Sequence, residues 1–337
     1  MLRLRQQNHD GARVVSQSSI ESQESCLVES FDPCGVIPAC LMPFRSDLSI
    51  DDAAYRKHVR HVVDVDGISA ITINGHAAEV HGLSFDEQRQ ALDLTKQELG
   101  DTLPVVAGVY AEGSLEAARI ARMATDGGAD CLLVFPPQSM ALGGAMRPEM
   151  AIEHFARIVD STDLPLILFQ YPISSGLGYP LATLLRLCDR FPAIRAIKDW
   201  CNDPPLHERH IRELHALDSP VRVLSTHSAW LLGSLVMGCD GLLSGAGSVI
   251  AHLQVAMWRA VQQGDLPAAR CVNEQMYPFV RAFYAEPLLD MHNRMKEALV
   301  TLGQFDEAHV RPPLMKLSTS EIDRIRDACR SGFARGG

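Results

Sequence analysis

The chain has 337 residues, 47% of them hydrophobic, and a formal net charge of -10 at pH 7. Length and apolar content allow a large core, in one barrel or two ordinary domains. Dispersed acidic residues leave no basic footprint for nucleic acid and no polybasic membrane anchor, and no apolar run approaches the roughly 20 residues that span a bilayer. The nine cysteines are scattered without a C-x-x-C pair. We therefore expect a cytoplasmic protein with reduced thiols, and neither a disulfide framework nor a zinc site.

Residues 1–31 are polar, with runs such as S-Q-S-S and E-S-Q-E-S and little periodic apolar content. Such a composition cannot bury enough apolar surface to fold by itself. We expect this segment to be a disordered or loosely attached extension.

From Cys34 onward, short apolar runs alternate with longer amphipathic segments. The runs expected to form strands are 35–40, 70–74, 104–108, 131–135, 165–170, 194–199, 221–225 and 241–244. The segments expected to form helices between them are 51–65, 84–99, 114–126, 147–161, 180–190, 205–217 and 229–237. Eight alternations of buried strand and crossover helix predict an α/β fold, a (β/α)8 TIM barrel over residues 32–250.

A doubly wound open sheet is the alternative to the barrel. That fold usually carries a glycine-rich phosphate turn after its first strand, and P-A-C-L-M-P-F is not one. The stretches 251–263, 266–286, 290–303 and 318–331 are also helical in pattern. They predict a C-terminal helical appendage, residues 251–337, packed on the barrel.

Lys198 stands at the end of the apolar run A-I-R-A-I-K-D. In a strand its side chain shares a face with Ile194 and Ala196, so the amine would lie on an apolar face. Poor solvation lowers an amine's pKa and makes it available to attack a carbonyl carbon. Periodicity alone favours a strand-end lysine that reaches solvent. In a barrel, however, the segments 74–76, 135–136 and 169–171 also end strands, and all would converge with Lys198 at the C-terminal mouth.

Several motifs follow one another in a characteristic order. They are I-P-A-C-L-M-P-F, G-H-A-A-E-V-H-G-L-S-F-D-E-Q-R, V-V-A-G-V-Y, G-G-A-D-C-L-L-V-F-P-P, L-I-L-F-Q-Y-P, A-I-K-D, G-C-D-G-L-L-S and V-R-P-P-L. Through them the chain resembles the dihydrodipicolinate synthase and N-acetylneuraminate lyase family of class I aldolases and lyases. The resemblance covers nearly all of residues 35–330. It implies a Schiff-base lysine at Lys198, a pyruvate-like 2-oxo acid as its partner, no external cofactor, and a homotetramer built from dimers.

The chain departs from this family where protons are handled. The family's G-T-T-G-E loop stands here as G-H-A-A-E from Gly75, so both threonine hydroxyls are missing. The family's catalytic tyrosine falls on Phe169, its interface tyrosine on Gln138, and the arginine that meets the second substrate of the synthases falls near Ser174. We therefore do not expect a true dihydrodipicolinate synthase. Gly75, Ala77, Phe169 and Leu243 are expected to contact the substrate.

Tyr171 and His76 are the candidates to replace the missing relay. Tyr171 shares a strand face with Phe169, although it could equally be a rim tyrosine. His76 occupies the position of a relay threonine, and an imidazole can give and take a proton near neutral pH, although a lone histidine is more often structural. The spacing of His76, Glu79 and His81 matches no metal-ligand signature, so no metal is expected.

Three other histidines receive weaker interpretations. His207 and His210 are expected to be solvated on an exposed helix face, and His227 is a minor polar candidate at the mouth. The sequence as a whole favours a class I Schiff-base lyase, an aldolase or a dehydratase acting on a 2-oxo acid. The alternatives are a barrel that binds such an acid without turnover and a structural homo-oligomer, which a lysine on an apolar strand face disfavours.

Overall fold

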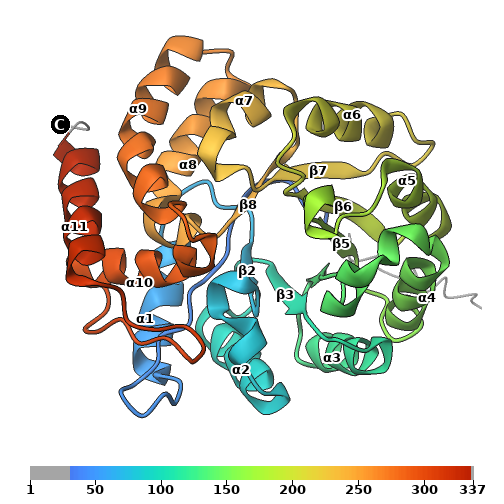
Figure 1. Cartoon of the computed structure of the whole chain (residues 1–337), viewed down its shortest axis with the longest axis horizontal. Coiled ribbons are helices and arrows are strands. Elements are labelled where there is room, and N and C mark those ends of the chain that lie inside the picture. Colours follow the sequence, from blue (N-terminus) through green and yellow to red (C-terminus); the bar gives the residue numbers. More distant parts are fainter. Residues whose placement is uncertain (1–30, 335–337) are drawn as a thin grey trace, which may run out of the picture.

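A computed structural model describes residues 31–334 of the chain. The expected N-terminal extension, residues 1–31, lies outside the described residues except for Phe31. Eight parallel strands form one sheet in the order β1-β8-β7-β6-β5-β4-β3-β2. They are β1 (Gly35–Pro38), β2 (Ile71–Ile73), β3 (Val105–Val109), β4 (Cys131–Val134), β5 (Leu166–Gln170), β6 (Ile194–Asp199), β7 (Arg222–Ser225) and β8 (Gly241–Ser244). The predicted (β/α)8 barrel is confirmed (Figure 1).

The barrel closes between its first two strands. Ala39 and Thr72 form a parallel bridge, and the backbone N–H of Cys40 donates to the carbonyl of Thr72 at 2.8 Å. All of β2, β3, β4 and β5 are buried. Continuous Val, Ile and Leu runs are what a strand covered on both faces requires, which is why the apolar runs locate the strands so well.

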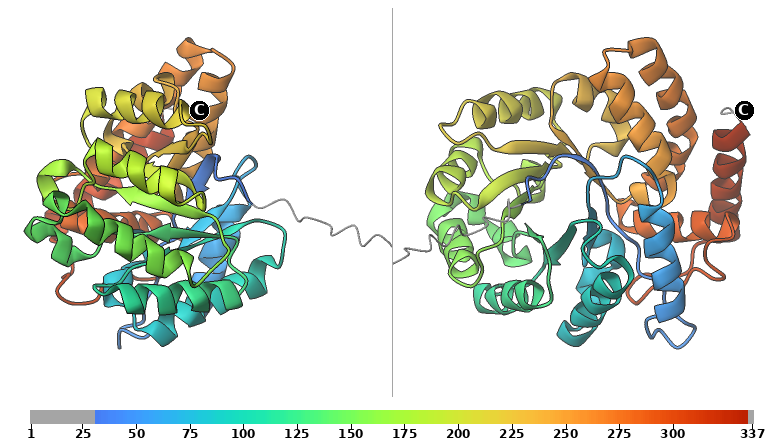
Figure 2. Two further views of the ribbon diagram at one scale, coloured as in Figure 1. Left: turned by 90° about the vertical axis from the view of Figure 1, so that its right-hand side faces the viewer. Right: turned by 180° about the vertical axis from the view of Figure 1, so that it is seen from behind.

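Helices surround the strands (Figures 1 and 2). They are α1 (Asp52–Val63), α2 (Phe85–Leu99), α3 (Ser114–Asp126), α4 (Pro148–Val159), α5 (Leu181–Arg190), α6 (Pro204–His215), α7 (Leu231–Val236) and α8 (Gly247–Gln262). Capping residues fix the N-terminal ends of several helices. Ser84 and Glu87 form a reciprocal capping box at α2, and Asp203 caps α6, whose first residue is proline.

Three more helices, α9 (Leu266–Phe283), α10 (Met291–Thr301) and α11 (Thr319–Ala334), lie together on one side of the barrel (Figure 1). Helix α8 packs on β1 and β8. The expected boundary between barrel and appendage, at residue 250, falls inside α8. None of the helices between residues 31 and 334 is long and apolar enough to cross a membrane.

One glycine shapes the barrel mouth beside the predicted site. A Cβ at Gly108, on β3, would overlap the backbone carbonyl of Asn74. The chain after β2 therefore approaches β3 closely, and only glycine leaves room for it. This contact fixes the turn that leads to His76.

Candidate active site

Lys198 lies near the C-terminal end of β6, in register with Phe169 of β5 and Leu224 of β7. Its side chain is 6% exposed, and its Nζ lies 4.2 Å from the centre of the Phe169 ring. Burial lowers the pKa of the amine to about 7. Among the described residues, no carboxylate forms an ion pair with it. The amine is thus buried and free of an acidic partner, the setting that favours its neutral form.

His76 and Tyr171 come together at the mouth. His76 opens the short helix η1 (His76–Ala78), and its Nε2 lies 2.8 Å from the hydroxyl of Tyr171. Burial and the nearby Lys198 lower the pKa of His76 well below its usual value, whereas burial raises that of Tyr171. Both groups are therefore uncharged at neutral pH. A protonated phenol can donate its hydrogen to Nε2 of a neutral imidazole.

Aromatic rings form the wall around these two residues. The ring of His76 lies 4.9 Å from that of Phe135, which lies 5.2 Å from that of Phe169. The rings of Phe169 and Tyr171 are 4.4 Å apart, and Trp200 lies 5.7 Å beyond Tyr171. Such a wall excludes water, which strengthens any hydrogen bond or charge interaction made inside it.

A small cavity of about 40 Å³ adjoins the lysine. Its lining is His76, Phe169, Lys198, Trp200, Thr226, Gly245, Tyr284, Met291 and His292. Three predicted site residues, Lys198, His76 and Phe169, belong to this lining, and Tyr171 joins it through His76. Gly75, Ala77 and Leu243 lie nearby but outside the lining, and Leu243 is fully buried on β8.

Two polar residues of the lining, His292 and Tyr284, were not anticipated from the sequence. His292 belongs to α10, and burial with the nearby Lys198 and Lys296 lowers its pKa to about 3. Tyr284 directly follows α9 as its C-cap; burial raises its pKa, and hydrogen bonding to Ser228 and Ser244 opposes the rise. Both arrive from the C-terminal helices. The βα pattern carries no signal that these helices reach the mouth.

Gly245 makes room for His292. A Cβ at Gly245 would lie 3.0 Å from Nε2 of His292, closer than normal packing allows. The glycine after β8 thus lets the imidazole enter the cavity from above the strand ends.

Behind the mouth lies a second, buried group of polar side chains. Nδ1 of His207 and Nδ1 of His210 both hydrogen-bond to Oδ2 of Asp199, at 2.8 and 2.7 Å. Burial acts to raise the pKa of Asp199, but the two hydrogen bonds outweigh it and the pKa falls. The expectation that His207 and His210 are solvated is wrong, because both are 0% exposed. Both side chains face the barrel because each hydrogen-bonds to the buried carboxylate of Asp199.

The matching family model, described as the dihydrodipicolinate synthetase family, spans residues 32–331. The chain belongs to this family. Its curated relatives include a 4-hydroxy-tetrahydrodipicolinate synthase of Haloarcula marismortui, 29% identical over 299 residues that cover 87% of this chain and 92% of the relative. An uncharacterized DapA-like lyase of Halobacterium salinarum is 28% identical over 287 residues, 85% of this chain and 90% of the relative.

Solved structures of the family share the fold. A monomeric dihydrodipicolinate synthase variant superposes with a TM-score of 0.83 at 21% identity, covering 91% of this chain and 99% of the other. YagE, a prophage protein of E. coli K12 solved in complex with pyruvate, gives a TM-score of 0.81 at 21% identity, with 89% and 98% covered. At this identity the solved structures show a shared barrel fold, and a fold alone does not establish the reaction of this chain.

Proposed function

We propose that the chain is a Schiff-base-forming lyase, an aldolase or a dehydratase, acting on pyruvate or a related 2-oxo acid or sugar acid. The observation that carries this proposal is the placement of Lys198: a buried amine at the mouth end of a barrel strand, with no acidic partner among residues 31–334. Membership of the family supports it. The pyruvate complex of YagE supports the choice of ligand.

The proposed chemistry begins with the nitrogen of Lys198. The neutral amine attacks C2 of the 2-oxo acid, and loss of water from the carbinolamine leaves a protonated imine. This cation withdraws electrons from the C3–C4 bond. When a base removes the C4 hydroxyl proton, that bond breaks, an aldehyde leaves and an enamine remains. Protonation of the enamine at C3 and hydrolysis of the imine release the second product and regenerate the lysine.

Proton transfer in this scheme falls to Tyr171 and His76. We propose that their 2.8 Å hydrogen bond forms a two-residue relay, in which the phenol exchanges a proton with substrate oxygen and passes its own proton to the imidazole. We propose that Gly75 and Ala77 meet the substrate carboxylate through their backbone, since neither side chain has a hydroxyl.

We further propose that the chain is not a true dihydrodipicolinate synthase. Phe169, Gln138 and Ser174 stand where the resemblance calls for two tyrosines and an arginine. Phenylalanine carries no proton, and losing one positioned acid–base group typically costs about 10²–10⁴ in rate. Condensation with aspartate semialdehyde should therefore be negligible.

A barrel that binds a 2-oxo acid without turnover is the second candidate. The specific observation in its favour is Phe169, whose ring covers the lysine where the family has its proton carrier. The first candidate is stronger because Tyr171 and His76 provide a connected replacement two residues further along.

Reductive trapping tests the proposal. Borohydride added with pyruvate should fix one adduct per chain, and peptide mapping should place it on Lys198. Lys296 is an internal control, because it is equally buried but paired with Glu79. Lys198→Met, which keeps the length and removes the amine, should abolish trapping.

Turnover then separates the two candidates. A panel of 4-hydroxy-2-oxo acids and sugar acids should yield pyruvate with at least one substrate. An adduct at Lys198 without turnover on any of them would favour the binding barrel. No adduct, or one that persists in Lys198→Met, would contradict the Schiff-base lyase.

A further inference from the structure

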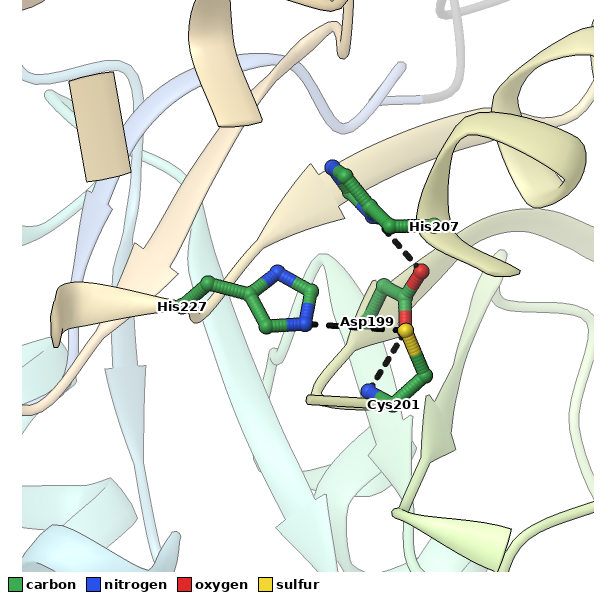
Figure 3. Close-up of side chains that lie close together, drawn as sticks. All are labelled: Asp199, Cys201, His207 and His227. Atoms are coloured by element: carbon green, nitrogen blue, oxygen red, sulfur yellow. Dashed lines mark hydrogen bonds and ion pairs between the residues drawn. The ribbon is translucent and has the colours of Figure 1, made fainter. Parts of the chain in front are cut away.

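Asp199, Cys201, His207 and His227 form a buried donor cluster on the outer side of β6 (Figure 3). Asp199 follows Lys198 in the strand, so its side chain points away from the barrel interior, toward α6. His207 comes from the first turn of α6, and His227 follows β7. Each side chain offers one ligand atom, and these four atoms all lie within 4.8 Å of one another. We propose that this cluster is a structural binding site for a zinc ion.

The kinds of donor point to zinc. One carboxylate oxygen, one sulfur and two imidazole nitrogens are all donor types that tetrahedral zinc takes, whereas Ca²⁺ and Mg²⁺ prefer oxygen alone. A carboxylate and a thiolate together balance the two positive charges of the ion. A neutral complex is the form in which four charged or polar ligands are least costly to bury. All four residues are at most 4% exposed.

The spacing is close to what such an ion needs. Tetrahedral zinc, with bonds of about 2.0–2.3 Å, keeps its ligand atoms roughly 3.3–3.7 Å apart. Sγ of Cys201 and Nε2 of His227 are 3.7 Å apart. Nδ1 of His207 and Oδ2 of Asp199 are closer, at 2.8 Å, because they are hydrogen-bonded to each other. Binding requires this pair to part slightly.

Two serines already hold the histidine rings in the required orientation. Nε2 of His207 lies 2.7 Å from Oγ of Ser234, which donates to Oγ of Ser225 at 2.7 Å. Because the Ser234 proton is used on Ser225, Oγ of Ser234 can accept a proton carried on Nε2 of His207. Nδ1 is then free to ligate once the ion replaces the proton that it shares with Asp199. Ser225 also lies 3.5 Å from Nδ1 of His227, whose Nε2 faces Cys201. Metal-bound histidines commonly have such partners on their second nitrogen.

The remaining neighbours define what the ion must displace. His210 also hydrogen-bonds Oδ2 of Asp199, and the N–H of Cys201 donates to Oδ1 at 2.8 Å. The N–H of Asn202 donates to Nε2 of His227 at 3.2 Å and would lose that acceptor. Binding expels the thiol proton of Cys201, so the sulfur ligates as a thiolate. With four protein ligands and no open position, the site is structural: it ties the ends of β6 and β7 to α6 just behind Lys198.

The test is metal content together with cobalt spectroscopy. Full-length protein equilibrated with zinc chloride and desalted should retain one zinc per chain by elemental analysis. Cys201→Ala and His227→Gln should each lower zinc affinity by at least about 10–100-fold, the cost of losing even an outer hydrogen-bond partner of a ligand. Cys188→Ala, at a buried cysteine of α5 outside the cluster, should keep full occupancy.

Cobalt tests the site without any variant. Co²⁺ added to the metal-free wild type should give a thiolate-to-metal charge-transfer band and the intense visible bands of tetrahedral cobalt, and Cys201→Ala should lose the former. A wild type that retains no zinc, or that binds cobalt without a thiolate band, would overturn the proposal. Asp199 would then be the centre of a hydrogen-bond network without a metal ion. Neither measurement involves substrate, so the result is independent of the lyase reaction.

Discussion

At the scale of single residues, the site is built from bases whose pKa values burial lowers. Burial lowers the pKa of Lys198 to about 7 and that of His292 to about 3, and His76 also titrates well below its usual value. If all three bases were protonated, their positive charges would repel one another in this small cavity. The repulsion disfavours protonation of all three at once. An imine formed on Lys198 would then be the main positive charge facing an anionic substrate.

This charge state alters the expected role of His76. The unperturbed pKa of histidine, about 6.5, suggested an imidazole that both gives and takes protons near neutrality. In the resting protein the imidazole is neutral and accepts the hydrogen bond of the Tyr171 hydroxyl. The phenol therefore exchanges a proton with the substrate, and His76 holds the phenolic proton only during that exchange. The two residues should behave as one unit.

We predict that His76→Ala and Tyr171→Phe each lower kcat by at least about tenfold on a verified substrate, while borohydride trapping at Lys198 is largely preserved. The double variant should be little slower than either single variant, because groups in one relay are not additive. Steady-state kinetics of the four proteins measures this coupling.

The matched control for this cycle is Tyr179→Phe. Tyr179 is a buried tyrosine just beyond the same strand, and its hydroxyl has no hydrogen-bond partner among the described residues. The Tyr179→Phe variant should retain wild-type kcat. Wild-type rates in both His76→Ala and Tyr171→Phe would mean that water or the substrate's own carboxylate moves the proton.

At the scale of elements, the loop that carries His76 is fastened to the C-terminal helices. Glu79 closes η1 in a left-handed conformation, with φ of 53°. Its carboxylate pairs with Lys296 of α10 and accepts the backbone N–H of Arg311 at 3.0 Å. Lys296 in turn donates to the carbonyl of His309 at 2.8 Å. The appendage thus positions a mouth loop some 200 residues away from it in the chain.

We predict that Lys296→Met destabilises the fold by about 3–5 kcal/mol, because it leaves the Glu79 carboxylate buried without its partner. Glu79→Gln combined with Lys296→Met should recover part of the loss, since no charge is then stranded. Urea unfolding followed by circular dichroism gives the free energies. Lys57→Met, at an exposed lysine, should stay within about 0.5 kcal/mol of wild type; a similar small loss in Lys296→Met would show that the pair contributes little.

The elements themselves were predictable because each depends on local pattern. Buried parallel strands require continuous apolar runs, and capping residues mark helix starts, so the predicted strand and helix ranges overlap those of the structure throughout. Helix α6 shows the limit. Its buried positions, His207, His210, Ile211 and Leu214, follow the spacing of an inward face. The histidines at two of these positions suggested a solvated face. Their hydrogen-bond partner, Asp199, lies on another element, so the helix sequence alone does not reveal it.

The active site was predictable to the same depth. Lys198, Phe169 and His76 stand at strand ends, and parallel strands bring their C-terminal ends to one mouth whatever the loops do. His292 and Tyr284 reach the cavity through the packing of α9 and α10 on the barrel, which no periodicity encodes. The Asp199 cluster was equally hidden, because Asp199, Cys201 and His207 follow no familiar metal-ligand spacing and the fourth donor, His227, comes from beyond β7.

At the scale of the whole molecule, several exposed apolar side chains lie on two adjoining segments beside the mouth. Leu142 is 95% exposed, Met146 84% and Ile173 43%, all on the short helices that follow β4 and β5. The two segments touch, because Gly176 packs against the backbone of Ala141. Contiguous exposed apolar side chains mark interaction surfaces. Gln138, where the resemblance implies a residue that crosses between subunits, begins the same segment.

The family resemblance implies a homotetramer, a dimer of dimers, and we predict that these side chains form one of its contacts. Light scattering coupled to size exclusion at micromolar concentration should give the mass of four chains. Leu142→Asp combined with Met146→Asp should shift the mass to a smaller species, because two carboxylates cannot be buried in an apolar contact without partners. Met315→Asp, which charges an exposed apolar side chain on the C-terminal segment, should leave the mass unchanged. A wild-type monomer would contradict the assembly itself, and a tetramer that survives the double substitution would place the contact on another face of the barrel.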